Sequence, residues 1–130
     1  MKVPQIISLF FLLSLLVVAD LDAQDYFAML QNKSYKTFEA HLASTVQIEK
    51  RRSKQEVSKA RAIEIVKKTM SELNPVKWEF VHKGVSEAQK DNYIVMKAFN
   101  AEGDGLRIFL YVHKAGDKRE ITAIRFRSTL

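Results

Sequence analysis

The chain has 130 residues, of which 21 are Lys or Arg and 15 are Asp or Glu, and 47% are apolar. This length and composition are typical of one globular domain and exclude a disordered or fibrous chain. The absence of Cys excludes disulfides, thiolate metal sites, thiol nucleophiles and a lipidated cysteine. The sequence contains no catalytic or metal-binding motif in their place, so it does not by itself assign a reaction.

The first segment has the pattern of an export signal. Met1 and Lys2 give a positive start, and residues 6–19 form an apolar run without charge. A membrane-spanning helix needs about 20 apolar residues, so this run favours a cleaved signal peptide over an uncleaved anchor. Cleavage can follow Ala19 or Ala23, and we prefer Ala23 because a short polar stretch precedes it. Residues 1–23 are therefore predicted to be a signal peptide and residues 24–130 a single domain.

The charge of the mature chain bears on its partners. Removal of residues 1–23 takes away one Lys and two Asp, which raises the net charge from +6 to +7. An exported protein does not routinely meet nucleic acid, so this basic character favours an anionic partner in the cell envelope. We expect a periplasmic or secreted protein with no nucleic-acid partner and no stable membrane span after cleavage.

Helices are predicted in the first half of the mature chain. Two short amphipathic helices, over 25–31 and 35–42, turn five residues inward: Phe27, Leu30, Tyr35, Phe38 and Leu42. A strand over 44–49 and a basic loop over 50–54 follow. Ser58 can cap a helix that ends at Leu73, before Asn74 and Pro75. Its apolar residues recur at three- and four-residue steps, at Ala62, Ile63, Val66, Met70 and Leu73.

The second half is predicted to form strands over 77–83, 93–100, 106–114 and 119–127. Gly84 is expected to start a turn, and the Gly/Asp segments 102–105 and 115–118 are expected to be hairpin turns. Along the strand over 106–112, Leu106 and Ile108 alternate with Phe109 and Tyr111, so both faces of the sheet are apolar. One layer of helices covers only one face, so we predict that the other pairs with a second copy in a homodimer. The alternative is a partly aromatic surface without a partner.

Several short motifs between residues 57 and 127 resemble those of a known family. They are Ser58-Lys59-x-x-Ala62, Trp78-x-Phe80-x-His82-x-Gly84, Tyr93-x-Val95 and Gly105-Leu106-Arg107-Ile108. They are similar to those of domain of unknown function 4783, short exported bacterial proteins of the nuclear transport factor 2-like superfamily. The resemblance implies an α+β cone-like fold, in which N-terminal helices pack on a curved antiparallel sheet, with a pocket between them and dimerisation through the convex face. The family has no assigned activity.

The sequence offers few candidate site residues. His82 shares the alternation of Trp78 and Phe80, so it is a candidate acid or base in a pocket, although a structural histidine explains it better. Trp78, Phe80, His82, Tyr93 and Tyr111 are the candidate ligand-binding residues, and core packing is the alternative for the aromatic ones. We assign no catalytic residue, no cofactor and no metal site, because the three His have no ligand spacing.

Basic residues supply a second candidate surface. Residues 50–54 are either an anion-binding loop or a solvated connection, and Arg125 and Arg127 either extend that surface or protect an edge strand. Three functions remain open. The leading one is a non-enzymatic, exported, dimeric binding or scaffold module that uses its pocket or its basic surface to hold a small apolar ligand or an anionic envelope partner. The others are a small pocket enzyme of isomerase, dehydratase or hydrolase type that uses His82, and an interaction adaptor without a pocket.

Overall fold

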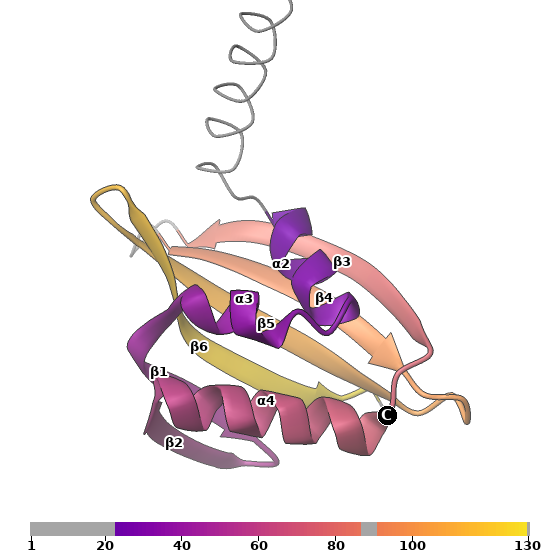
Figure 1. Cartoon of the computed structure of the whole chain (residues 1–130). Coiled ribbons are helices and arrows are strands. Elements are labelled where there is room, and N and C mark those ends of the chain that lie inside the picture. Colours follow the sequence, from indigo (N-terminus) through magenta and orange to yellow (C-terminus); the bar gives the residue numbers. More distant parts are fainter. Residues whose placement is uncertain (1–22, 87–90, 130) are drawn as a thin grey trace, which may run out of the picture.

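The structure, a computed structural model, describes residues 23–86 and 91–129 (Figure 1). The predicted signal peptide over 1–23 lies outside the described residues except for its last residue, Ala23. In chain order the elements are α2 (Ala23–Gln31), α3 (Tyr35–Ala40), β1 (Leu42–Lys50), β2 (Ser53–Ser58), α4 (Lys59–Leu73), β3 (Lys77–Ser86), β4 (Asp91–Phe99), β5 (Gly105–Ala115) and β6 (Lys118–Ser128). Within the described part of the chain, no helix has the length and apolar character needed to cross a membrane.

The strands form one curved sheet, in the order β2-β1-β6-β5-β4-β3, and the three helices lie against one side of it (Figure 1). We call this the helix-facing side and its opposite the outer face. The predicted α+β fold class is confirmed. The antiparallel expectation is wrong at one pair, because β1 and β6 run parallel. After α4 the chain forms a four-strand antiparallel meander, β3 to β6, which starts at the sheet edge opposite β2. Its last strand, β6, lies beside β1 and runs in the same direction as β1.

Helix α4 is formed as its sequence predicts. The Ser58 hydroxyl accepts a hydrogen bond from the Arg61 amide at 3.2 Å, which satisfies one free donor of the first turn. Asn74 ends the helix in the left-handed conformation, and its amide donates to the Met70 carbonyl. The buried side of α4 packs on β1 and consists of Ala62, Ile63, Val66, Thr69 and Met70.

The core lies between the helices and the sheet. Phe38 of α3 is fully buried, and it joins apolar residues from β1, β4, β5 and β6 in one cluster. The side chains that the predicted short helices turn inward are in this cluster or packed against it. The second of these helices ends at Ala40, earlier than predicted, because Leu42 already starts β1.

The expected basic loop over 50–54 is shorter than predicted, because Lys50 ends β1 and Ser53 already starts an additional strand, β2. Lys50 pairs with Ser53 at the end of an antiparallel hairpin, and only Arg51 and Arg52 form its turn. Strand β2 is a solvated edge strand in which Val57 is the one half-buried apolar residue, so it lacks the alternation that marks a half-buried strand.

Strand β3 contains a bulge that changes which way its side chains point. Phe80 pairs with Met96, but His82 pairs with Val95, so Val81 is an additional residue between them. The predicted turn at Gly84 is also wrong, since Gly84 continues the strand and pairs with Tyr93. The ring of Tyr93 covers Gly84, and a Cβ atom there would lie 2.4 Å from the Tyr93 ring. The hairpin turns predicted at 102–105 and 115–118 are confirmed between β4, β5 and β6.

Candidate functional site

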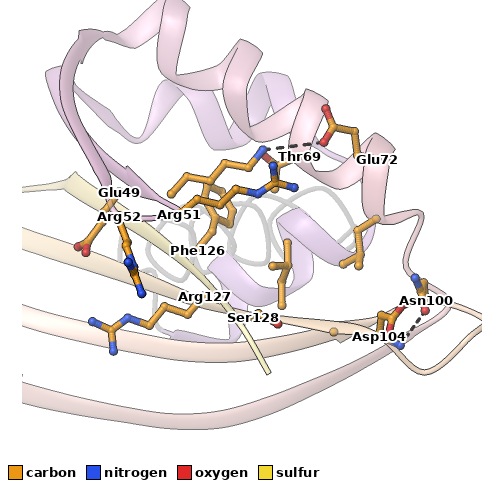
Figure 2. A pocket seen from close by; sticks show the side chains of 14 residues that line it. Glu49, Arg51, Arg52, Thr69, Glu72, Asn100, Asp104, Phe126, Arg127 and Ser128 are labelled. Carbon is orange, nitrogen blue, oxygen red and sulfur yellow. Dashed lines mark hydrogen bonds and ion pairs between the residues drawn. The ribbon is translucent and has the colours of Figure 1, made fainter. Parts of the chain in front are cut away.

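A cleft of about 580 Å³ opens where the last turn of α4, the β1–β2 turn, the β4–β5 turn and the end of β6 meet (Figure 2). The meeting of these elements follows from the topology, because β6 ends beside the C-terminal end of α4 (Figure 1). The volume is within the range of sites that take small molecules, about 300–1,000 Å³.

The inner part of the cleft combines an apolar floor with one lysine. Phe126, which is 4% exposed, forms the floor together with Leu73 and Leu106. Lys50 pairs with Phe126 across β1 and β6, so its side chain lies on the helix-facing side. The Lys50 ammonium donates to the Thr69 hydroxyl at 3.1 Å, and Thr69 in turn donates to the Ile65 carbonyl. This lysine is therefore held under α4.

Three arginines border the cleft. Arg51 and Arg52 come from the β1–β2 turn, and Arg127 comes from β6. In Figure 2, the side chain of Arg51 runs toward the end of α4 that carries Thr69 and Glu72, whereas Arg127 points away from that helix. The rim is therefore basic, and its charge comes from two elements distant in sequence.

The carboxylates beside the cleft offset part of this charge. Glu49 accepts a hydrogen bond from the Arg125 guanidinium at 2.6 Å, which joins β1 to β6 on the outer face. Glu72 lies 4.0 Å from the Lys50 ammonium, in an ion pair of long distance. Asp104 belongs to the β4–β5 turn, where its amide donates to the Asn100 side chain. Arg125 is thus occupied, and the expectation that it protects an edge is wrong because β6 lies inside the sheet.

The five candidate ligand-binding residues do not lie together. Trp78 and Phe80 face the helices and pack against the core, and Phe27 of α2 contacts both of them edge to face, with ring centroids 6.0 and 5.8 Å apart. The pairing of Phe80 with the buried Met96 places it on the helix-facing side. Neither aromatic residue lines the cleft.

His82, Tyr93 and Tyr111 are on the outer face instead. Because of the bulge at Val81, the His82 side chain lies on the same face of the sheet as Val95. The prediction that His82 shares a face with Trp78 and Phe80 is therefore wrong. The His82 Nε2 atom lies 3.3 Å from the Tyr93 hydroxyl, and both groups are at the surface. Within the described residues, no carboxylate is bonded to His82.

The outer face is apolar in its centre, as the strand pattern predicts. Val95 is 6% exposed, and Tyr93, Phe109 and Tyr111 are half-buried. A row of cations borders this centre: Arg107 of β5 lies at the position opposite Lys97 of β4 and opposite Arg127 of β6. A shallow depression of about 310 Å³, lined in part by Tyr111 and Arg125, lies on the same face.

Sequence reasoning missed the residues that form the cleft. Lys50 continues the inward alternation of Val46 and Ile48, and this spacing was a usable signal for a lysine that faces the helices. Phe126 alternates in the same way with the outward Arg125 and Arg127. The chemistry available at the cleft is the binding of an anion beside an apolar surface. In the described part of the chain, no cluster of three His, Cys, Asp or Glu side chains could hold a metal ion.

The chain is similar to known proteins in both sequence and structure. The family model described as domain of unknown function (DUF4783) matches residues 23–127. No protein of curated function matches the chain.

Among solved structures, a DUF4783 protein from Bacteroides fragilis YCH46 is 18% identical with a TM-score of 0.64, over 73% of this chain and 87% of that one. One from Bacteroides ovatus ATCC 8483 is 13% identical with a TM-score of 0.69, over 79% and 91%. A candidate ketosteroid isomerase from Kribbella flavida DSM 17836 is 13% identical with a TM-score of 0.57, over 83% and 75%. These likenesses establish the nuclear transport factor 2-like fold, and at such identities they extend to the fold alone.

Proposed function

The chain belongs to the DUF4783 family, and we propose that it is an exported binding module that holds a small molecule in the cleft and pairs with a second copy through the outer face. The cleft is the observation that carries this proposal. Its apolar floor around Phe126 can shelter the body of a ligand, and its rim supplies few but well-placed polar groups. Binding without catalysis is favoured because His82, the candidate acid or base, is on the outer face.

The pairing of two copies is supported by the composition of the outer face. Its centre presents Val95, Phe109 and two tyrosines, and aromatic residues are enriched at protein interfaces. A twofold axis through this centre would let the same apolar surface cover itself in both copies. The cation row at 97, 107 and 127 would then lie at the rim, where charges remain solvated.

Native mass spectrometry of the full-length chain, expressed with its own N-terminal segment in a bacterial host, tests both parts. We expect a dimer of the chain shortened at its N-terminus, with an additional small mass on each copy. Leu73 lines the cleft, so the larger side chain of Leu73→Trp should fill it. We expect this variant to be detected without the additional mass. Val76→Trp is the matched control, since Val76 is 66% exposed and does not line the cleft.

The dimer is tested separately with Phe109→Glu, which places a charge in the centre of the outer face. We expect this variant to be monomeric with unchanged far-ultraviolet circular dichroism, and Val81→Glu, at an exposed edge position, to stay dimeric. A wild-type monomer would contradict the pairing. A wild-type chain with no additional mass would contradict the binding role, and an additional mass that persists in Leu73→Trp would contradict its place in the cleft.

A further inference from the structure

The turn between β1 and β2 uses two residues that are poorly suited to it. Lys50 pairs with Ser53, so Arg51 and Arg52 alone connect the strands. Both have positive φ, 52° and 69°, in the left-handed region that residues with a side chain rarely adopt. Two-residue hairpin turns with positive φ at both positions strongly prefer Asn-Gly. The backbone therefore does not explain two consecutive arginines, whereas a role for their side chains would.

The carboxylates that the structure describes beside the cleft form no ion pair with the guanidinium groups of Arg51 and Arg52. Among the described residues, Arg51, Arg52 and Arg127 form no ion pair, since Glu49 is bonded to Arg125 and Glu72 lies near Lys50. Arg127 faces outward, opposite Arg107, so among the described residues the cations without an ion pair at the mouth of the cleft are Arg51 and Arg52.

We propose that the ligand is an amphipathic anion, with an apolar body that ends in one carboxylate or phosphate group, and that the Arg51-Arg52 turn binds that group. This inference rests on the proposed function and names the class of ligand that the cleft takes. Guanidinium groups bind carboxylate and phosphate through two parallel hydrogen bonds, and a planar fork fits both head groups. The apolar body lies on Phe126, Leu73 and Leu106, which continue the core to the surface.

The inner lysine has a different role in this arrangement. The Lys50 ammonium already donates to Thr69 and faces Glu72, so part of its hydrogen-bonding capacity and charge is used within the protein. Arg51 and Arg52 are exposed at the mouth, where an anionic head group keeps contact with water and loses little of its hydration. The ligand thus enters with its apolar end inward and its charge on the turn.

The experiment measures the binding of three eight-carbon probes, octanoate, octyl phosphate and octanol, by titration calorimetry on the full chain at low salt. We expect at least one anion to bind about tenfold or more tightly than octanol, because the head group alone distinguishes them. The variant Arg51→Asn/Arg52→Gly should lose that preference and also melt several degrees higher, about 5 °C, because it supplies the residues that the turn prefers.

Two further variants separate side-chain chemistry from backbone and net charge. Arg51→Gln/Arg52→Gln keeps long side chains in the turn, and it should lose anion binding without the gain in melting temperature. Lys33→Asn/Lys36→Gln is the matched control, since it also removes two positive charges and Lys33 also has positive φ, 58°, but neither residue lines the cleft. It should keep the binding of the wild type.

The outcomes distinguish the two proposals. Equal binding of octanol and both anions overturns the anionic ligand and leaves the binding module standing. Anion binding that survives in Arg51→Asn/Arg52→Gly overturns the role of the turn. Absence of binding by all three probes, together with no retained mass in native mass spectrometry, overturns the module and the ligand class together. A preference for octanoate over octyl phosphate, or the reverse, supports the inference and identifies the head group.

Discussion

The hydroxyl of Tyr26 provides a sharp test of the packing between α2 and the rest of the fold. Tyr26 is 2% exposed, and its hydroxyl oxygen is buried without a hydrogen-bond partner among the described residues. Such a group has lost its hydration without compensation, at a cost of about 1–3 kcal/mol. The ring itself is well placed, since it contacts His41 edge to face with centroids 5.8 Å apart.

Replacement by phenylalanine keeps the ring and removes the unpaired oxygen. We therefore expect Tyr26→Phe to raise the free energy of unfolding by about 1 kcal/mol, the lower end of the cost of the buried hydroxyl. The measurement is urea denaturation at neutral pH, with Tyr35→Phe as the control. Tyr35 is half-buried and its hydroxyl is not an unpaired buried group in the described structure, so its change should be smaller.

The dependence of stability on alkaline pH provides a second test of Tyr26. Burial raises the pKa of Tyr26, Arg119 opposes this effect, and Asp25 adds to it. The native state therefore keeps the phenolic proton at pH values where the unfolded chain loses it, so stability is complete below the ordinary pKa and falls as the pH rises through it. Tyr26→Phe should lessen this alkaline loss. A destabilised Tyr26→Phe protein with an unchanged alkaline slope would refute the reasoning, because it would mean that the hydroxyl is satisfied.

Three other perturbations test separate contacts. Burial lowers the pKa of His41, so the unfolded chain binds more protons than the native state and stability falls as the pH drops. Urea denaturation between about pH 7.5 and about 5.5 should show a less steep fall for His41→Gln than for the wild type, and equal slopes would contradict this. A double-mutant cycle with Glu49→Gln and Arg125→Met should give a coupling of about 1 kcal/mol or more, since the two side chains are only 20% and 28% exposed, and a coupling near zero would mean that the pair behaves as a solvated one. Gly84→Ala should cost about 1–2 kcal/mol in thermal unfolding because its Cβ meets the Tyr93 ring, and the cost should disappear in a Tyr93→Ala background.

The parts of the fold that sequence could predict are those governed by local rules. Helix α4 was predictable because Ser58, the apolar spacing and Asn74 agree on one element, and the contacts that each would make are formed. The alternation in β5 likewise separated its side chains into two apolar faces, and the structure places the face with Ile108 and Leu110 toward the helices. Strand β2 could not be predicted, because it is held at the edge by backbone pairing to β1 and carries one half-buried apolar residue.

The candidate site was harder to predict from the sequence, since it depends on strand register and on elements far apart in the chain. The bulge at Val81 moves His82 to the other face, and no local pattern distinguishes this from continued alternation. The cleft brings together Arg51 and Arg127, 76 positions apart, and their proximity follows from the parallel pairing of β1 and β6. The sequence indicated both basic segments, but only the topology joins them at one cleft.

The place of β6 also has a consequence for how the molecule acquires its structure. This last strand of the chain lies inside the sheet, between β1 and β5, so the β1–β2 hairpin and the β3–β5 meander are not joined until it arrives. Closing the parallel pair brings together segments separated by most of the chain, which is an entropically costly step and a slow one. A chain in which β6 has not yet been synthesised therefore holds a hairpin and a three-strand meander with unpaired edges. The eleven residues of β6 join these two units into one cooperative sheet.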